Sequence, residues 1–396
     1  MPRNGSTRRD ALKLVGTAAG AASLSGIATA APGEDGESVE VNIGWANERG
    51  RSTAKDADGE VVREFGFDAM TKRMPEPAIE GLRNNPNIRY VEENGTMEAL
   101  AQTTPWGIDR TDSEVAHAND STGAGADVAI IDTGVDDDHP DLEGNVGEGR
   151  AFATCGTGGT FGGCFVSGNS NDCNEDWSDD NDHGTHCAGT ASAINNDEGV
   201  VGVSTQATIH PVKVLDCAGS GSFSDIAAGV EYVADQGWDV ASMSLGGDSS
   251  SEALRDACQY AADEGVFLVA AAGNSGECTD CVGYPAAYDE VMAVSATSED
   301  DSLASFSSTG PEVEIAAPGE DVNSTVPGGY EELSGTSMAC PHVAGAAGQL
   351  AAEGLSRTDI RETLNSTAED IGLDENESGN GLLDVAAALG YDSSDD

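Results

Sequence analysis

The chain has 396 residues and carries 71 Asp and Glu against 18 Lys and Arg, a formal net charge of −53. This charge excludes nucleic acid and anionic membrane surfaces as partners, because phosphate groups would be repelled. The acidic residues are spread over every segment, so self-repulsion would destabilise the compact state in dilute salt and be screened in concentrated salt. We therefore predict a protein that needs high salt; the alternative is an acidic protein without that need.

Residues 1–30 have the pattern of an export signal. A twin arginine at Arg8 and Arg9 precedes a short, mildly apolar run at 14–27, and Ala28-Thr29-Ala30 offers a small-residue cleavage site. This pattern predicts a twin-arginine signal and a secreted protein; an amphipathic anchor is the alternative. No other segment has the ~20 apolar residues needed to span a bilayer.

Residues 31–100 predict a polar linker (31–37) followed by a small α+β unit. Alternating or β-branched residues favour strands at 39–44, 61–65 and 87–93, and residues 78–83 favour a helix. Such a unit is either a permanent second domain or a segment that is removed on maturation.

From residue 101 to the C-terminus, short apolar runs alternate with helical ones. The expected strands are 128–131, 209–215, 240–245, 266–271, 291–296 and 313–316, and the expected helices are 185–194, 224–236, 251–264 and 337–353. This alternation predicts an α/β fold whose parallel sheet is covered by helices on both faces. Ligands in such folds bind at the carboxyl ends of the strands, which is where Asp132 and Asn274 lie.

The helix predicted at 337–353 is apolar almost all round, which is typical of a buried helix. It follows a glycine turn, and we expect Pro341 in its first turn, where a missing N–H costs nothing. Ser337 then lies at the start of this helix, where free N–H groups and the dipole favour negative charge. This position suits a reactive hydroxyl and the oxyanion that it generates.

A reactive serine needs a base within hydrogen-bond reach. Asp132 ends a β-branched strand before a glycine turn, and His183 begins a helix of small residues. An imidazole can take the proton of Ser337, and a carboxylate can fix its tautomer. The order Asp, His, Ser is that of subtilisin. With whole motifs matched around all three residues, the chain resembles the subtilisin-like serine proteases over residues 39–388, and its composition resembles the secreted halolysins of extreme halophiles.

The resemblance implies a fold, an activity and a domain plan. Ser337 would be the nucleophile, His183 the base and Asp132 its partner, while the Asn274 amide and the Ser337 backbone N–H would bind the oxyanion. Residues 31–100 would be an inhibitory propeptide whose tail fills the cleft, and residues 101–396 a monomeric catalytic domain released by autoprocessing. The implied function is a broad serine endopeptidase that cuts proteins and peptides.

The resemblance also assigns the substrate-binding segments. The bound peptide would pair as an added strand with two backbone segments, formed by Gly219, Ser220 and Gly221 and by Ser244, Leu245 and Gly246. Small residues at 271–273 and Gly283 would line the pocket for the side chain before the cut bond. Small residues without charge predict a preference for large apolar or aromatic side chains. Phe223 would either lie at a more distant apolar subsite or pack as an ordinary helix residue.

Calcium is the cofactor that the resemblance implies, as a structural ion. The matching ligand positions are Gln102, Asp141, Ile194, Asn196, Glu198 and Val200, which together offer an all-oxygen shell; a plain turn is the alternative. No spacing supports a zinc site. The acidic residues Asp172, Glu175, Asp176, Asp179, Asp180 and Asp182 form either a second calcium site or, as we favour, a solvated loop.

Nine cysteines leave at least one unpaired unless chains cross-link. Cys155–Cys164 and Cys278–Cys281 are candidate local loops, and relatives suggest a bridge between the places of Cys173 and Cys217. Cys187 and Cys340 are expected to be free thiols on buried helices.

Two rival functions remain: a narrow processing protease, which the acidic insertion at 155–182 suggests, and a non-catalytic peptide-binding module.

Overall fold

The computed structural model describes residues 38–94, 102–153, 155, 173–276 and 278–393. The chain divides into two compact units, residues 1–99 and 100–396, each described by itself below. The predicted export signal at 1–30 and the linker at 31–37 lie outside the described residues, as does the expected start of the catalytic domain at Ala101. Among the described helices, none is both long and apolar enough to cross a membrane.

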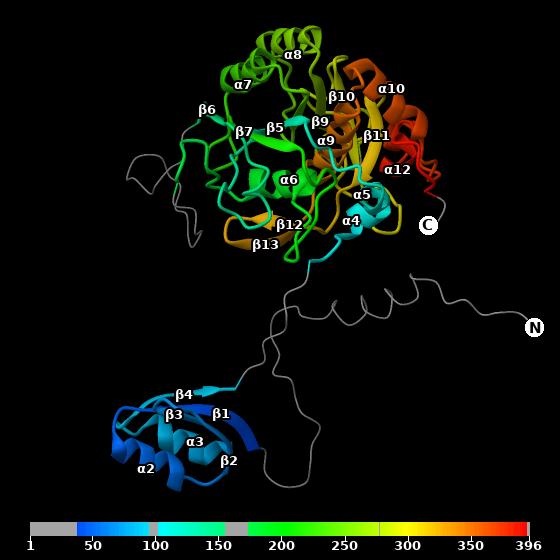
Figure 1. Cartoon of the computed structure of the whole chain (residues 1–396). Helices are drawn as coiled ribbons and strands as arrows, with labels where there is room; N and C mark the ends of the chain where they lie inside the picture. Colours follow the sequence, from blue (N-terminus) through cyan, green and yellow to red (C-terminus); the bar gives the residue numbers. More distant parts are fainter. Residues whose placement is uncertain (1–37, 95–101, 154, 156–172, 277, 394–396) are drawn as a thin grey trace, which may run out of the picture. The chain divides into compact units, whose positions relative to one another are not determined.

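The first unit is a small α+β fold (Figure 1). Its elements are β1 (Ser38–Trp45), α2 (Glu48–Asp56), β2 (Glu60–Glu64), β3 (Ala69–Pro75), α3 (Glu76–Arg83) and β4 (Ile88–Glu93). The strands form an antiparallel sheet in the order β2-β3-β1-β4. Alternate residues of β1, Val41, Ile43 and Trp45, are buried in a core with Ile79 and Leu82 of α3. The sequence pattern missed α2, because only Gly50 and Ala54 of that helix are buried.

The second unit is built on one parallel sheet, as predicted. Its strands, counted over the described residues, lie in the order β11-β10-β9-β8-β5-β7-β6. They are β5 (Asp127–Asp132), β6 (Arg150–Ala151), β7 (Thr208–Lys213), β8 (Val240–Met243), β9 (Phe267–Ala271), β10 (Val291–Thr297) and β11 (Val313–Pro318). Most are buried along their whole length, because helices cover both faces of the sheet.

The helices divide between the two faces (Figure 1). One face is covered by α6 (His183–Ser192), α9 (Thr336–Ala352) and α10 (Arg357–Thr367), and the other by α7 (Phe223–Gln236) and α8 (Glu252–Glu264). Serine caps at Ser222 and Ser251 begin α7 and α8, and left-handed glycines at Gly237 and Gly265 end them. The α/β fold class predicted from the sequence is therefore confirmed.

Smaller elements complete the second unit. The hairpin β12 (Val322–Val326) and β13 (Gly329–Leu333) packs against α6, and the short helices are α4 (Trp106–Arg110), α5 (Ser113–Ala118), α11 (Glu375–Ser378) and α12 (Val385–Ala388). The repeated apolar runs that reveal the sheet are absent from these segments. The sequence pattern therefore did not predict them.

The cysteines differ in part from the predicted pairing. Cys155 is bonded to Cys173, and Cys278 to Cys281. The expectation that Cys155 pairs with Cys164 is wrong, and so is a Cys173–Cys217 bridge, although Cys217 is itself disulfide-bonded. Cys187 and Cys340 are free and buried as predicted. Local spacing favoured the nearest partner, whereas the fold brings Cys173 beside Cys155.

Candidate active site

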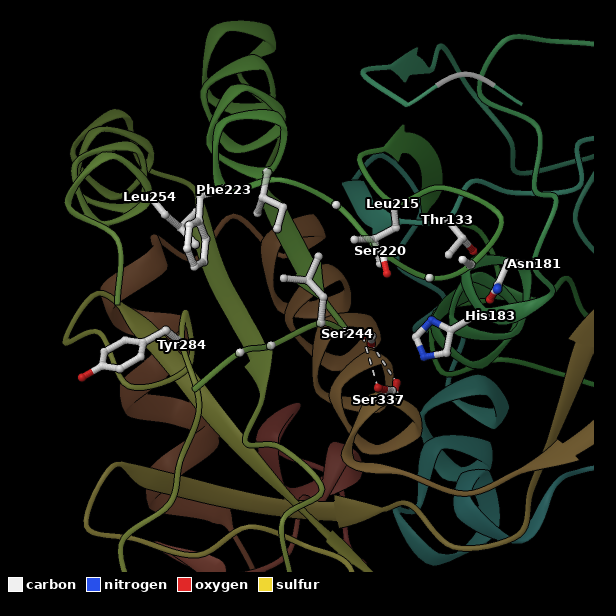
Figure 2. Close-up of a pocket in the computed structure, with 17 residues that line it drawn as sticks. Thr133, Asn181, His183, Leu215, Ser220, Phe223, Ser244, Leu254, Tyr284 and Ser337 are labelled. Atoms are coloured by element: carbon white, nitrogen blue, oxygen red, sulfur yellow. Dashed lines mark hydrogen bonds between the residues drawn. The ribbon is translucent and has the colours of Figure 1, made fainter. Parts of the chain in front are cut away.

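A cavity of about 530 Å³ opens where β5, β7 and β8 end and where α6 and α9 begin (Figure 2). Both His183 and Ser337 line it. They are 154 positions apart in the sequence and belong to different helices, α6 and α9. The six predicted peptide-binding residues line it too: Gly219, Ser220, Gly221, Ser244, Leu245 and Gly246. Parallel strands carry these segments to one edge of the sheet, as their topology requires.

Asp132 and His183 form a hydrogen-bonded pair. The Nδ1 atom of His183 lies 2.7 Å from Oδ1 of Asp132, which is fully buried at the end of β5. Burial is the largest single influence and would lower the pKa of His183, but the charges of Asp132 and Cys187 and the hydrogen bonds to both together raise this pKa well above 6.5. Because the carboxylate accepts from Nδ1, the Nε2 atom is left as the ring's acceptor.

Thr133, next to Asp132, joins the strand end to the start of α6. Its hydroxyl donates to Oδ1 of Asp179 at 2.8 Å and accepts from the backbone N–H of Gly184 at 2.9 Å. Asp179 is fully buried and also accepts from the hydroxyl and the N–H of Thr185. This network fixes the turn after Asp132 against the first turn of α6, which carries His183.

Ser337 lies in the first turn of α9, with Gly335 as the N-cap residue. Its hydroxyl donates to the carbonyl oxygen of Ser244 at 3.2 Å, and not to His183. Ser337 and His183 nevertheless face the same cavity (Figure 2). Catalytic hydrogen bonds are often long or misaligned before a substrate binds, so this geometry is compatible with proton transfer to Nε2.

Pro341 is the sixth residue of α9 and lies in its second turn, not in the first turn as predicted. Since proline has no N–H, it cannot donate to the carbonyl of Ser337, four residues earlier. The Ser244 hydroxyl donates to that carbonyl instead, at 2.8 Å, and the Cys187 thiol lies 3.5 Å from it. The Ser337 carbonyl that the proline leaves without a helical partner therefore connects the nucleophile to Ser244, directly after β8, and to Cys187 of α6.

Asn274 lies just beyond β9, in a second cavity of about 150 Å³ that it shares with Ser337. Its Oδ1 atom accepts from the N–H of Thr336 at 2.9 Å and from the Thr336 hydroxyl at 3.0 Å. With its oxygen held in this way, the amide NH₂ group is the donor that remains beside Ser337. This arrangement suits the stabilisation of an oxyanion.

The second cavity corrects one prediction about specificity. Ala271, Gly273 and Gly283 line it as expected, but so do Asp248 and the disulfide-bonded Cys281. The predicted absence of charge at this pocket is therefore wrong. No sequence pattern pointed to Asp248, because it lies in a loop beyond Gly246 and Gly247, outside the matched segments.

The first cavity has an apolar part that the sequence only partly revealed. Phe223 lines it and is 44% exposed, so it is not packed away as an ordinary helix residue. Leu215, Ile226, Leu254 and Tyr284 also line this part of the cavity, and the sequence did not single them out. Ile226 and Leu254 are buried residues of α7 and α8, and Leu215 and Tyr284 lie in loops, so no sequence pattern distinguishes them from ordinary core and loop residues.

Five of the six predicted calcium ligands lie together. The Nε2 atom of Gln102 donates to the carbonyls of Ile194 (2.8 Å) and Val200 (2.9 Å) and lies 3.4 Å from Oδ1 of Asn196. Fully buried Asp141 accepts from Asn196 Nδ2 and from the N–H of Val200, both at 2.9 Å. Glu198 contributes its N–H to Asn196 Oδ1. The Tyr330 hydroxyl, which was not predicted, also bonds to Asp141.

The oxygen atoms around Gln102 fit a hard cation. Rotation of the Gln102 amide would exchange Nε2 for Oε1, so all groups that converge here can present oxygen. Calcium prefers such mixed carboxylate, carbonyl and amide shells. The ligand set therefore fits the predicted ion.

The remaining histidines have structural partners. Burial lowers the pKa of His186 and of His342 to about 4, and each bonds to backbone carbonyl oxygens. His139 bonds to Gly329, His117 to Val203, and His210 to Asp127. None of these five lines the cavity that His183 and Ser337 share.

Comparison with known proteins agrees with this geometry. The profile of the subtilase family matches residues 123–383. Subtilisin amylosacchariticus of Bacillus subtilis subsp. amylosacchariticus is 40% identical over 336 residues, 83% of each chain. An alkaline protease of Shouchella clausii is 40% identical over 341 residues, covering 85% of this chain and 83% of the relative. A thermostable alkaline protease of Halalkalibacterium halodurans is 39% identical, covering 85% and 88%.

Proposed function

The chain belongs to the subtilase family and is a subtilisin-like serine endopeptidase, and from this premise we propose that Asp132, His183 and Ser337 are its catalytic triad. The observation that carries the proposal is the cavity shared by His183 and Ser337, with Nδ1 of His183 held 2.7 Å from buried Asp132. The proposed protein is a secreted precursor that processes itself and works in concentrated salt.

The proposed reaction has two halves, acylation of Ser337 and hydrolysis of the acyl-enzyme, and the same groups act in both. Ser337 Oγ attacks the peptide carbonyl carbon while Nε2 of His183 takes the hydroxyl proton, and the carbonyl oxygen becomes an oxyanion. The Asn274 amide and the Ser337 N–H donate to that oxyanion. His183 then gives its proton to the departing amine, and water hydrolyses the acyl-enzyme by the same route.

We propose broad specificity with a preference for apolar or aromatic side chains. The apolar part of the cleft around Phe223, Leu215 and Ile226 supports this preference, and glycines on both sides let a substrate backbone approach closely. The experiment is incubation of the purified enzyme with unrelated proteins in molar salt, with mass analysis of the products. Cuts at many sites support the proposal, and cutting at only one sequence would favour a narrow processing protease.

We propose residues 31–100 as the inhibitory propeptide and the twin-arginine signal as the export route. The separate four-stranded unit at 38–93 supports a segment that folds apart from the catalytic unit. A protease exported after folding would otherwise meet cytoplasmic proteins. Mass analysis of the secreted protein tests the plan: a mature form that begins near Gln102 supports it, and a stable full-length form contradicts it.

The acid limb of the pH profile is expected above pH 6.5. His183 must be neutral to accept the proton of Ser337, and its pKa is raised by Asp132, so kcat/KM rises as pH increases through that raised value. The measurement is kcat/KM for a small peptide substrate between about pH 5 and pH 10, in molar salt. An acid limb at or below 6.5 would contradict the assignment.

Asp248→Asn is expected to reduce cleavage after Lys and Arg relative to cleavage after Phe. Asp248 is an acidic residue that lines the smaller cavity and is exposed, so its attraction for a cationic side chain is worth about two- to five-fold in kcat/KM. The effect should grow as salt is lowered toward the limit of stability, because salt screens exposed charges. An unchanged ratio of the two substrates at every salt concentration refutes this role.

We propose calcium as a structural cofactor held by Gln102, Asp141, Ile194, Asn196 and Val200. Its chelation is expected to lower the Tm by roughly 5 °C or more, because an ion bound only to the folded state stabilises that state. Asp141→Asn should abolish the response to chelator, whereas Asp197→Asn, an exposed residue of the same loop, should keep it. A Tm that is insensitive to chelator in the phosphonate-inhibited wild type would rule the ion out.

A further inference from the structure

One buried ion pair beside the proposed triad has no part in the mechanism above. Lys213 ends β7 and is fully buried; its ammonium lies 2.6 Å from Oδ1 of Asp180, which is 5% exposed. Lys213 is also the single lysine of residues 101–396. In a chain that carries almost no lysine, the one retained in this unit is inside the protein and next to the active site.

The contacts of Lys213 tie together the two segments that carry Asp132 and His183. Lys213 is the register partner of Asp132 across the β5–β7 ladder, and its ammonium donates to the carbonyl of Thr133, the residue after Asp132. Its other partner, Asp180, lies three residues before His183. One side chain therefore joins the turn after Asp132 to the segment that leads into α6.

That segment has a conformation that needs support. Asp182, between Asp180 and His183, has φ +85°, which is unfavourable for a residue with a side chain. On its N-terminal side Asp180 is held by Lys213, and Asn181 is held by its side-chain bond to the Cys217 carbonyl at 3.0 Å. Fixing the residues before Asp182 fixes where the chain enters α6, and therefore where the imidazole of His183 stands.

We propose that Lys213 and Asp180 are positioning residues that clamp the Asp132 turn to the His183 segment and thereby set the geometry of the catalytic pair. The inference rests on the proposed triad. It also corrects the prediction that this acidic loop is simply solvated, since Asp179 and Asp180 are buried and bonded. Asp179 and Asp180 are therefore interior residues of the site, whereas Glu175 and Asp176 of the same cluster are exposed.

The charges of Lys213 and Asp180 are also expected to act on the protonation of His183, in opposite directions. The titratable groups around His183 and the pair are the carboxyl groups of Asp132, Asp179 and Asp180, the ammonium of Lys213, the thiol of Cys187 and the imidazole of His186. Removing the positive charge of Lys213 should favour protonated His183, and removing the negative charge of Asp180 should disfavour it. A contact that only stabilised the fold would give no such opposite shifts.

The test compares Lys213→Met, Asp180→Asn and the double variant, with active sites counted by titration with a phosphonate. Each single variant should lose on the order of 10–100-fold in kcat for a small peptide with KM little changed, because misplaced catalytic groups slow the chemical step. The acid limb of kcat/KM should move up in Lys213→Met and down in Asp180→Asn, by roughly 0.5 pH unit or more. In the double variant it should return toward the wild-type position.

Arg361→Met is the matched control, because it breaks the partly buried Arg361–Glu314 pair that joins α10 to β11, away from the cavity. It should lower the Tm and leave kcat and the acid limb unchanged. If Lys213→Met does not fold, Asp180→Asn decides alone. Variants that lose only Tm, as the control does, overturn the proposal. A wild type that hydrolyses no peptide bond would instead refute the proposed function on which it rests.

Discussion

Ser337→Ala is expected to abolish both peptide hydrolysis and maturation. Without the hydroxyl there is no nucleophile to attack, and a loss in kcat on the order of 10⁶-fold follows, as for the serine of a related subtilisin. The variant should accumulate as an intact precursor, because the proposed autoprocessing needs the same hydroxyl. The measurement is casein degradation in molar salt, together with the mass of the secreted chain.

The control for this variant is an exposed serine that does not line the cavity. Ser366 lies in α10, and its hydroxyl donates to the Thr363 carbonyl at 3.2 Å. Ser366→Ala should therefore mature and retain its activity. A Ser337→Ala protein that still degrades casein would remove Ser337 from the mechanism, whereas an inert wild type would leave the peptide-binding module as the better account.

Dilution of the enzyme from about 1 M salt to about 0.1 M should unfold it and remove more than about 90% of its activity. The permanent cations of residues 101–396 are Arg110, Arg150, Lys213, Arg255, Arg357 and Arg361, set against acidic residues in every segment. The screening length grows from about 3 Å to about 10 Å over this dilution, so neighbouring surface carboxylates begin to repel one another. Circular dichroism and peptide hydrolysis, followed together, measure the transition.

A non-ionic osmolyte separates screening from general stabilisation. Sucrose strengthens burial without screening charge, so it should not replace salt if repulsion between carboxylates is the cause. Full rescue by sucrose in dilute buffer would point to another cause. An enzyme that is folded and active in about 0.1 M salt would contradict the predicted need for high salt altogether.

Much of the fold could be predicted because its signals are local. The apolar run at 128–131 is β5, and the small-residue run at 337–353 is α9, each within one or two residues of the expected bounds. The chain order of Asp132, His183 and Ser337 also predicted which strand ends and helix starts should meet. The parallel topology then brings His183 and Ser337 to one cavity.

What the sequence did not reveal depends on packing between distant segments. Lys213 and Asp180 are charged, and in a sequence charged residues predict an exposed surface, yet the pair is buried because each supplies the other's partner. Pro341 was predicted one turn too early in α9. Nothing local in the sequence indicates that the Ser244 hydroxyl would donate to the Ser337 carbonyl in place of the missing proline N–H. Asp248 and the Cys155–Cys173 bridge were missed for the same reason.

The most direct test of the proposed triad is labelling of the mature enzyme with a serine-directed phosphonate, followed by identification of the modified residue by mass spectrometry. We expect modification of Ser337 alone, with a rate that rises with pH through the raised pKa of His183 and collapses in His183→Ala. Labelling at another residue, or an undiminished rate in His183→Ala, would contradict it.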